Sequence, residues 1–243
     1  MFYYFDFRTW FTLIRLAARE SNPRQRRGLM KLLLLIVPLR AVAHALFFFL
    51  DGILFPGLWR VNVRAPVFVI GHARSGTTLA HRLLSGDERF STFRYWELML
   101  PSLTERKLVH LVAWIDRTLL GRRIEKRLDA WEQRKFGPTQ HIHKMGLNIP
   151  EEDDLILQHS CASGFWMTQL PYMGEMDFFH VDQRLPRSRQ RMMRFYRECV
   201  RRQLYLNGSH HIHLSKNPTW CGRVQTLIEV FPDARFVVLY RNP

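Results

Sequence analysis

The chain has 243 residues, of which 47% are hydrophobic, so it can bury a sizeable core and is not globally disordered. Its formal net charge of +15 favours a polyanionic ligand or an acidic membrane surface. No zinc-finger, RNP or basic-zipper pattern occurs, so we do not expect nucleic acid as a partner. The scattered cysteines and the lack of a secretory signal pattern predict a cytoplasmic location.

Residues 1–60 predict a helical extension. Its most apolar part, residues 29–50, contains Pro38 and is interrupted by charged side chains such as Arg40. An arginine near the centre of a spanning helix costs roughly 2.5–3.5 kcal/mol. The sequence allows three structures for this segment: a spanning helix, a helix lying in the membrane plane and a buried helical hairpin. Membrane contact through residues 25–58 would place the chain on the anionic inner face of the membrane.

The sequence GHARSGTT follows the apolar run VFVI and precedes the helical pattern TLAHRLL. A strand, a loop bounded by Gly71 and Gly76, and a helix start form an anion cradle, because backbone N–H groups and the helix dipole point at one place. The glycines have the Walker A spacing, but Thr77 and Thr78 follow where Lys-Ser/Thr is expected. The cation comes earlier, at Arg74, whose guanidinium can bind two oxygens of one oxyanion.

A large helical insertion is expected over residues 101–206. Within it, Pro150 and the four acids that follow are typical of a first helical turn. Residues 187–206 have an amphipathic pattern, with Met192 and Tyr196 on the apolar face. Arginines that include Arg202 cover the rest, and we expect them to face solvent, with contact to an acidic acceptor or to lipid as the alternative.

The C-terminal part predicts a β-α-β unit. The runs HIHL (residues 211–214) and FVVLY (236–240) are typical of short strands, and apolar residues at helical spacing lie between them. We therefore predict an α/β fold for residues 61–243, with a P-loop-like parallel sheet flanked by helices. Because such sheets usually have more than three strands, we also expect the chain to be incomplete at its C-terminus.

The pattern disfavours metal-dependent NTP hydrolysis. No strand ending in Asp follows the loop, since FVVLY is followed by Arg241. The histidine groups at residues 141–143 and 210–213 lack an arranged cysteine or carboxylate partner, so we interpret them as strand or loop histidines. No metal is expected.

Together these motifs resemble the sulfotransferase family. GHARSGTT is similar to the family's 5′-phosphosulfate loop, in the RSGTT form of bacterial and tyrosylprotein sulfotransferases. FVVLYRNP is similar to the strand and Arg-Asn-Pro of the 3′-phosphate site, and HLSKNPTWCGRVQTLIEVFPDAR resembles a stretch of the bacterial branch. The resemblance covers residues 67–100 and 213–243. It implies in-line transfer of a sulfonate from 3′-phosphoadenosine 5′-phosphosulfate (PAPS) to an acceptor hydroxyl or amine.

The resemblance also implies roles for the loop. Arg74 would hold the 5′-phosphate and the bridging oxygen, and Ser75, Gly76, Thr77 and Thr78 would surround the same phosphate.

Three further residues are candidates by their position in the family motifs. Arg241 would bind the 3′-phosphate. Glu97 lies at about the distance from the loop at which the tyrosylprotein branch places its catalytic glutamate, with a helix N-terminal role as the alternative. Lys216 follows a strand where parallel sheets bind ligands, and would reach the transferring sulfonate unless it is a solvated loop lysine.

Two other functions stay open on the residues alone. One is a P-loop kinase or NTPase variant, and the other is a non-catalytic, membrane-peripheral nucleotide-binding fragment. For a sulfotransferase, the acceptor could be a carbohydrate, a lipid, a small alcohol or a protein tyrosine. The apolar, basic N-terminal region favours a lipid or membrane-proximal acceptor.

Overall fold

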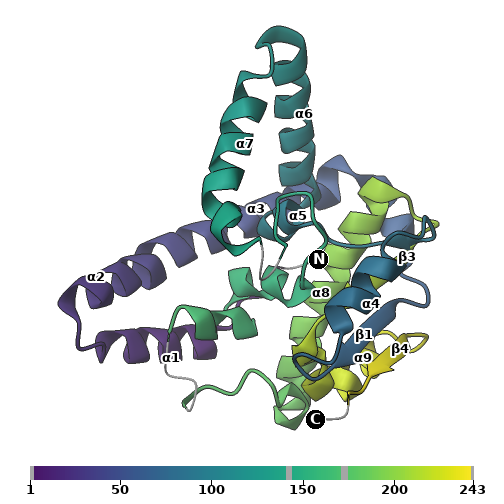
Figure 1. Ribbon diagram of the computed structural model, residues 1–243. Helices are drawn as coiled ribbons and strands as arrows, with labels where there is room; N and C mark the ends of the chain where they lie inside the picture. The colour runs from purple at the N-terminus through teal and green to yellow at the C-terminus, as the bar shows by residue number, and fades with distance from the viewer. Residues whose placement is uncertain (1–2, 141–143, 171–174, 242–243) are drawn as a thin grey trace.

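The computed structural model describes residues 3–140, 144–170 and 175–241. Four parallel strands form one sheet in the order β2-β3-β1-β4 (Figure 1). The strands are β1 (Val67–Gly71), β2 (Phe90–Ser91), β3 (Ile212–Lys216) and β4 (Arg235–Leu239). The predicted α/β class and its three strands are confirmed. The short β2 was not predicted, because two residues carry no periodicity.

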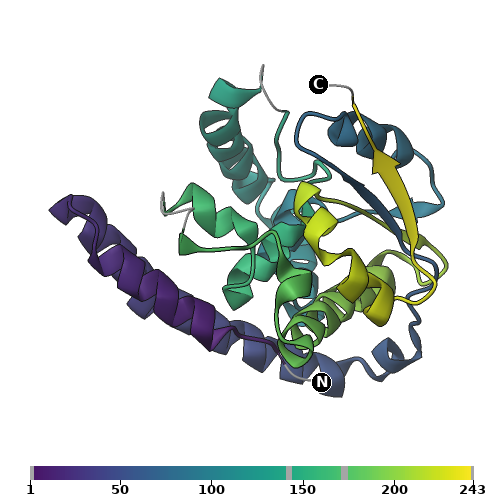
Figure 2. The ribbon, with the colours of Figure 1, turned by 90° about the horizontal axis from the view of Figure 1, so that it is seen from below.

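The two faces of β1 pack on different layers, because successive side chains of a strand point to opposite sides. Val67 and Val69 join Leu214 in a cluster against α4 (Thr77–Leu84). Phe68 and Ile70 belong to the main core, which α8 (Pro186–Asn207) and α9 (Val224–Val230) cover from the other side. Figures 1 and 2 show these helices on opposite faces of the sheet. The central strand is therefore fully buried.

Helices also make up the regions on either side of β1. The N-terminal ones are α1 (Phe7–Ala18), α2 (Pro23–Lys31), the π-helical η1 (Leu32–Ile36), α3 (Val37–Leu54) and the 3₁₀ helix η2 (Pro56–Arg60). The insertion holds α5 (Tyr95–Met99), α6 (Leu103–Leu119), α7 (Arg123–Phe136) and the 3₁₀ helices η3 (Gly137–Thr139), η4 (Asp153–Ser160), η5 (Gly164–Thr168) and η7 (Val181–Gln183). The 3₁₀ helix η8 (Pro218–Arg223) precedes α9. In Figure 1, α6 and α7 form a protruding hairpin.

The helices α2, η1 and α3 run on from one another over Pro23–Leu54. The π-helical turn lies just before Pro38, which lacks the N–H that an α-helix requires. By length and composition this continuous helix could cross a membrane. It contains an 18-residue stretch with a mean hydropathy of 2.2, and 22% of that stretch is buried. Core helices and signal sequences share these properties, so composition alone does not choose among the alternatives.

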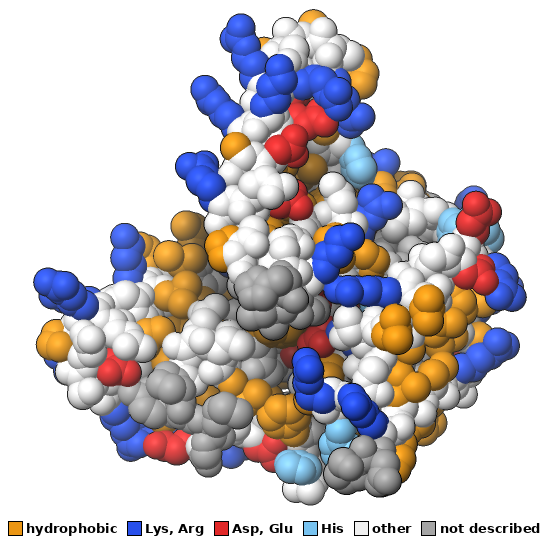
Figure 3. Space-filling view, in the orientation of Figure 1, with side chains coloured by type: hydrophobic (Ala, Val, Ile, Leu, Met, Phe, Trp, Pro, Cys, Tyr) orange, Lys and Arg blue, Asp and Glu red, His pale blue; other side chains and the backbone are white. Residues whose placement is uncertain are grey.

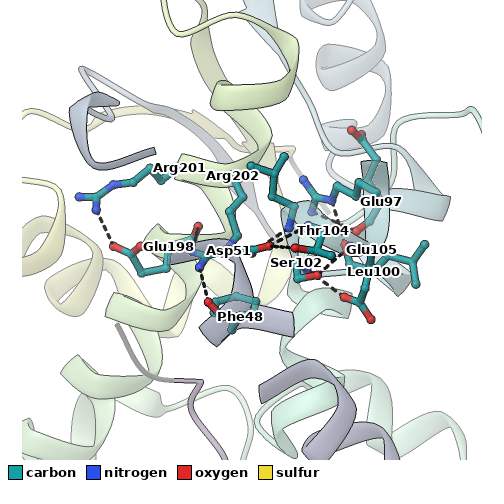
Figure 4. Close-up of polar contacts among 12 residues, drawn as sticks. Phe48, Asp51, Glu97, Leu100, Ser102, Thr104, Glu105, Glu198, Arg201 and Arg202 are labelled. Atoms are coloured by element: carbon teal, nitrogen blue, oxygen red, sulfur yellow. Dashed lines mark hydrogen bonds and ion pairs between the residues drawn. The ribbon is translucent and has the colours of Figure 1, made fainter. Parts of the chain in front are cut away.

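The N-terminal region is joined to the core by a buried ion pair (Figure 4). Asp51 of α3 is 0% exposed and accepts from Nε of Arg202 at 2.6 Å. Arg202 is 1% exposed, so the prediction that it faces solvent on α8 was wrong. Its guanidinium also lies 3.8 Å from the centre of the Phe48 ring. Helical periodicity marked the arginine as polar, but a carboxylate from a distant helix makes its burial favourable.

Candidate functional site

The loop between β1 and α4 holds two residues in the left-handed backbone region. Gly76, the residue that caps α4, has φ of 94°, a left-handed conformation that favours glycine. Arg74 also has a positive φ of 70°. A non-glycine residue pays on the order of 1 kcal/mol for this conformation, and such residues cluster at ligand sites. The loop thus keeps the backbone of Arg74 in a strained conformation, and this residue is exposed beside the start of a helix.

Gly71 allows the loop to approach the neighbouring strand. It pairs with Leu239 of β4, and a Cβ at Gly71 would lie 2.5 Å from the Leu239 carbonyl oxygen and 2.7 Å from Oγ of Ser75. Ser75 closes the turn by donating its hydroxyl to the His72 carbonyl oxygen at 2.7 Å. Any larger residue at position 71 would push the loop away from the end of β4.

A hollow of about 370 Å³ lies where the loop meets the end of β4. Its lining includes Arg74, Ser75 and Arg241. The structure therefore brings together three of the residues predicted for donor binding, from segments more than 150 residues apart in the sequence. Thr77 is buried at the first position of α4, while Thr78 is half-buried beside it. The roles of all these residues in binding stay predictions.

Lys216 ends β3, directly beside the strand that leads into the loop. Its Cα pairs with that of Val69, and its side chain is 2% exposed. The ammonium donates to Oε1 of Glu152 at 2.6 Å. A solvated loop lysine was the alternative interpretation, and the burial of Lys216 makes that alternative wrong. Its contact with a sulfonate stays a prediction.

Glu97 lies in the first turn of α5 and is 2% exposed. Its Oε2 accepts from the backbone N–H of Arg94 at 2.8 Å, and its carbonyl oxygen accepts from Arg106 at 3.1 Å. The helix N-terminal role considered as the alternative is therefore present. Its role as the catalytic base stays a prediction.

Sequence reasoning missed a second functional candidate, Glu152. It lines another hollow of about 370 Å³, together with Tyr95, Leu155 and Phe165. Figure 3 shows acidic side chains at the base of a depression on the face it draws, with Lys and Arg side chains around it. The signal was the acidic run after Pro150. We interpreted it as a helix start, and η4 does begin there with Asp153 and Asp154 in its first turn. Glu152 precedes that helix and accepts from Lys216 instead.

His81 of α4 is buried, 2% exposed, and interacts electrostatically with Lys216. Burial is the main cause that lowers its pKa to about 4, and Lys216 lowers it further while Asp153 opposes the shift. His213 and Arg82 also disfavour the charged ring. His81 is therefore neutral in the folded chain at neutral pH.

We expect acid to destabilise the chain through His81. An unfolded histidine titrates near 6.5, so from pH 6.5 down to about 4 the unfolded state takes up a proton that the folded state excludes. The stability present above pH 6.5 is lost over this window, by on the order of 3 kcal/mol. In urea unfolding at pH 7 and pH 4.5, His81→Gln should lose less stability on acidification than wild type. The exposed His210→Gln should behave as wild type, and equal losses in all three would contradict the assignment.

Among the described residues, no group of three or more His, Cys, Asp or Glu side chains is arranged to hold a metal ion. Residues 141–143 lie outside the described part of the chain. His213 is buried, and its ring nitrogens contact Tyr196 at 2.9 Å and Gln203 at 2.8 Å. It is thus a satisfied strand histidine, as expected from the residues.

The parallel sheet, the glycine-bounded loop and the helix that starts at Thr77 define an α/β protein of the P-loop type. The sulfotransferase family model matches residues 66–243, so the chain belongs to the sulfotransferase family. The membership inferred from the RSGTT loop and the closing Arg-Asn-Pro is confirmed.

Curated relatives include the omega-hydroxy-beta-dihydromenaquinone-9 sulfotransferases Stf3 of Mycobacterium bovis and Mycobacterium tuberculosis. Each is 27% identical over 184 residues, which cover 73% of this chain and 42% of the relative. The chain thus spans less than half the length of these proteins.

Two solved structures have a similar fold. Sulfotransferase STF1 from Mycobacterium tuberculosis H37Rv gives a TM-score of 0.62 at 20% identity, covering 96% of this chain and 60% of its own. Sulfotransferase STF9 from Mycobacterium avium gives a TM-score of 0.63 at 21% identity, covering 100% of this chain and 59% of its own.

Proposed function

We propose that the chain binds PAPS and transfers its sulfonate to an acceptor hydroxyl or amine. The observation that carries the proposal is the hollow that joins Arg74 and Ser75 of the loop to Arg241 beyond β4. Two separated cations beside a helix start suit a ligand with two phosphate groups. Membership of the sulfotransferase family supports the same donor.

The loop residues would hold the donor's 5′-phosphate, with Arg74 and the N–H groups at the start of α4 as donors. Arg241 would bind the 3′-phosphate. Lys216, at the carboxyl end of the neighbouring strand, would lie closest to the transferring group. The absence of a Cβ at Gly71 supports this assignment, because a Cβ would meet the Leu239 carbonyl oxygen and push the loop outward.

A kinase or NTPase is the second candidate. Thr77 occupies the position of the Walker lysine, and none of the four described strands ends in aspartate. Thermal shift and calorimetry with adenosine 3′,5′-bisphosphate, ATP and GTP, each with and without Mg²⁺, separate the two functions. We expect the bisphosphate to stabilise the chain without Mg²⁺, by about 2.7 kcal/mol at a hundredfold excess over its Kd. Mg²⁺-dependent binding of ATP in preference to the bisphosphate would overturn the proposal.

We further propose that the acceptor is a lipid-like alcohol and that the chain docks on an anionic membrane. The curated Stf3 relatives are named for an omega-hydroxy menaquinone. In this chain, large apolar side chains of η1 and α3 stay exposed at alternating spacings of four and three residues, on the side of the helix opposite the buried Phe48. They are Leu35, Leu39, Val42, Leu46, Phe49 and Ile53, each 55–68% exposed.

Charge supports a membrane as the occupant of this surface. Arg24, Arg26, Arg27 and Lys31 are exposed on α2, at the N-terminal end of the same continuous helix. Basic side chains beside an apolar helix face favour in-plane binding to anionic lipid. The opposite face packs on the domain through buried Val37, Phe48 and Asp51. The exposed apolar face, the basic end and the packed opposite face support a helix that lies along a bilayer surface.

Liposome flotation tests the docking. We expect the chain to float with vesicles that contain phosphatidylglycerol and less with phosphatidylcholine alone. The double variant Leu39→Glu/Phe49→Glu should lose flotation, because it places two charges in the apolar face. Ile228→Glu, at a 49% exposed position on α9, is the matched control. If the double variant floats as well as wild type, the apolar face does not bind the membrane. If wild type is a dimer and the double variant is a monomer, the face binds a second copy of the chain instead.

A further inference from the structure

A third hollow, of about 550 Å³, lies along α8 and is lined mainly by arginines. They are spaced three or four residues apart, which places them on one face of the helix. Tyr3 and Tyr4 of the N-terminal segment complete the lining beside them. This arginine hollow shares no described lining residue with the loop hollow or with that of Glu152, so it is a separate feature. Its arginines are Arg191, Arg194, Arg197 and Arg201.

The positive charges of the arginine hollow are not balanced by acids. Among its described lining residues the one acid is Glu198, whose carboxylate lies 3.3 Å from the Arg201 guanidinium and 3.3 Å from that of Arg202. Nε of Arg197 and Nε of Arg201 are buried and find no hydrogen-bond partner in the described part of the chain. A buried N–H without an acceptor is unfavourable, so the hollow presents donors that an anion would satisfy.

The arginine hollow adjoins the exposed apolar face of α3. A neighbouring hollow of about 210 Å³ is lined by Phe49 and Ile53 of that face, and Glu198 and Arg201 line both hollows. Figure 4 shows the guanidinium of Arg201 beside Glu198, pointing away from Asp51. A surface with anion-binding side chains at one end and exposed apolar side chains at the other suits an amphiphile, with a charged headgroup and apolar chains.

The spacing of the arginines suits more than one phosphate. A rise of about 1.5 Å per residue spreads Arg191 to Arg201 over about 15 Å of the helix. The planar fork of an arginine binds two oxygens of one phosphate, so one or two arginines can hold each group. Four arginines along this length therefore favour a ligand with two phosphates over a ligand with one.

We propose that the arginine hollow binds the headgroup of a phospholipid with two phosphate groups, whose acyl chains lie against the apolar face of α3. Arg191 and Arg194 hold one phosphate, and Arg197 and Arg201 hold the other. The inference rests on the membrane docking proposed above and adds selection among anionic lipids to it. The basic side chains of α2, by contrast, attract any anionic surface.

Flotation with two kinds of vesicle tests the headgroup site. Cardiolipin carries two phosphates joined by one glycerol, and phosphatidylglycerol carries one. Each is mixed with phosphatidylcholine to the same negative charge, at the same ionic strength. We expect half-maximal binding of the full chain at a lipid concentration at least fivefold lower with cardiolipin. The double variant Arg191→Gln/Arg194→Gln, at exposed positions, should bind both vesicles equally.

The matched control is Arg123→Gln/Arg127→Gln, which removes the same charge from exposed positions of α7 and should keep the preference for cardiolipin. Equal binding of the wild-type chain to the two vesicles would overturn the headgroup site but leave the docking intact. Loss of the preference in both double variants would also overturn it, because net charge would then be the cause. A wild-type chain that floats with neither vesicle would refute the docking itself.

Pyrophosphate distinguishes a lipid from a soluble occupant of the arginine hollow. Adenosine 3′,5′-bisphosphate is first added to saturation, so that the loop is filled. If pyrophosphate then binds in a way that Arg191→Gln/Arg194→Gln abolishes, and the vesicles show no preference, the hollow binds a soluble diphosphate and the lipid is the wrong occupant. A preference for cardiolipin that the same variant abolishes supports the lipid.

Discussion

Replacing Asp51 with alanine is expected to lower the free energy of unfolding by about 3–5 kcal/mol, because it leaves the buried guanidinium of Arg202 without its partner. Asp51 also accepts from the backbone N–H groups of Leu103 at 2.9 Å and Thr104 at 2.7 Å, at the start of α6 (Figure 4). One carboxylate thus joins α3, α6 and α8. Urea denaturation measures the loss.

The matched control for Asp51 is Asp129→Ala, at an exposed position of α7. It should change stability by no more than about 0.5 kcal/mol. A loss below about 1 kcal/mol in Asp51→Ala would show that Arg202 finds another partner. Glu198, whose carboxylate lies 3.3 Å from the Arg202 guanidinium, is the nearest candidate.

Replacing Arg74 with alanine should weaken binding of adenosine 3′,5′-bisphosphate roughly 100-fold, because hydrogen bonds to charged groups contribute about 1.5–3 kcal/mol. Arg74→Lys should give an intermediate loss, since lysine keeps the charge but not the planar fork. Isothermal titration calorimetry measures each Kd.

Arg64→Ala removes an exposed arginine outside the loop and serves as the control for Arg74. Its Kd should stay within threefold of wild type. If Arg74→Ala and Arg64→Ala weaken binding equally, the effect reports the net positive charge of the chain and not the loop.

Much of the fold near the loop could be predicted because its signals are local. The run VFVI, the two glycines and the helix pattern after Thr77 are contiguous, and each fits one strand, one turn or one helix start. The β-α-β unit that ends in β4 was predicted for the same reason. The sheet then places the carboxyl ends of its parallel strands at one edge.

The polar pairs of the core and of the second hollow could not be predicted in this way. Arg202 and Asp51 are 151 residues apart, and Lys216 and Glu152 are 64 apart. Nothing in either local pattern separates a buried, paired charge from a solvated one.

The sequence by itself determined the α/β class, the loop and its cation at Arg74, and membership of the sulfotransferase family, because these depend on short-range backbone conformation and motif order. Tertiary structure alone decided that Arg202 is buried, that Glu97 caps a helix and that Glu152 lines a hollow beside Lys216. The physical reason is that the free energy of a buried charge depends on its partner, and only the folded chain brings that partner within reach.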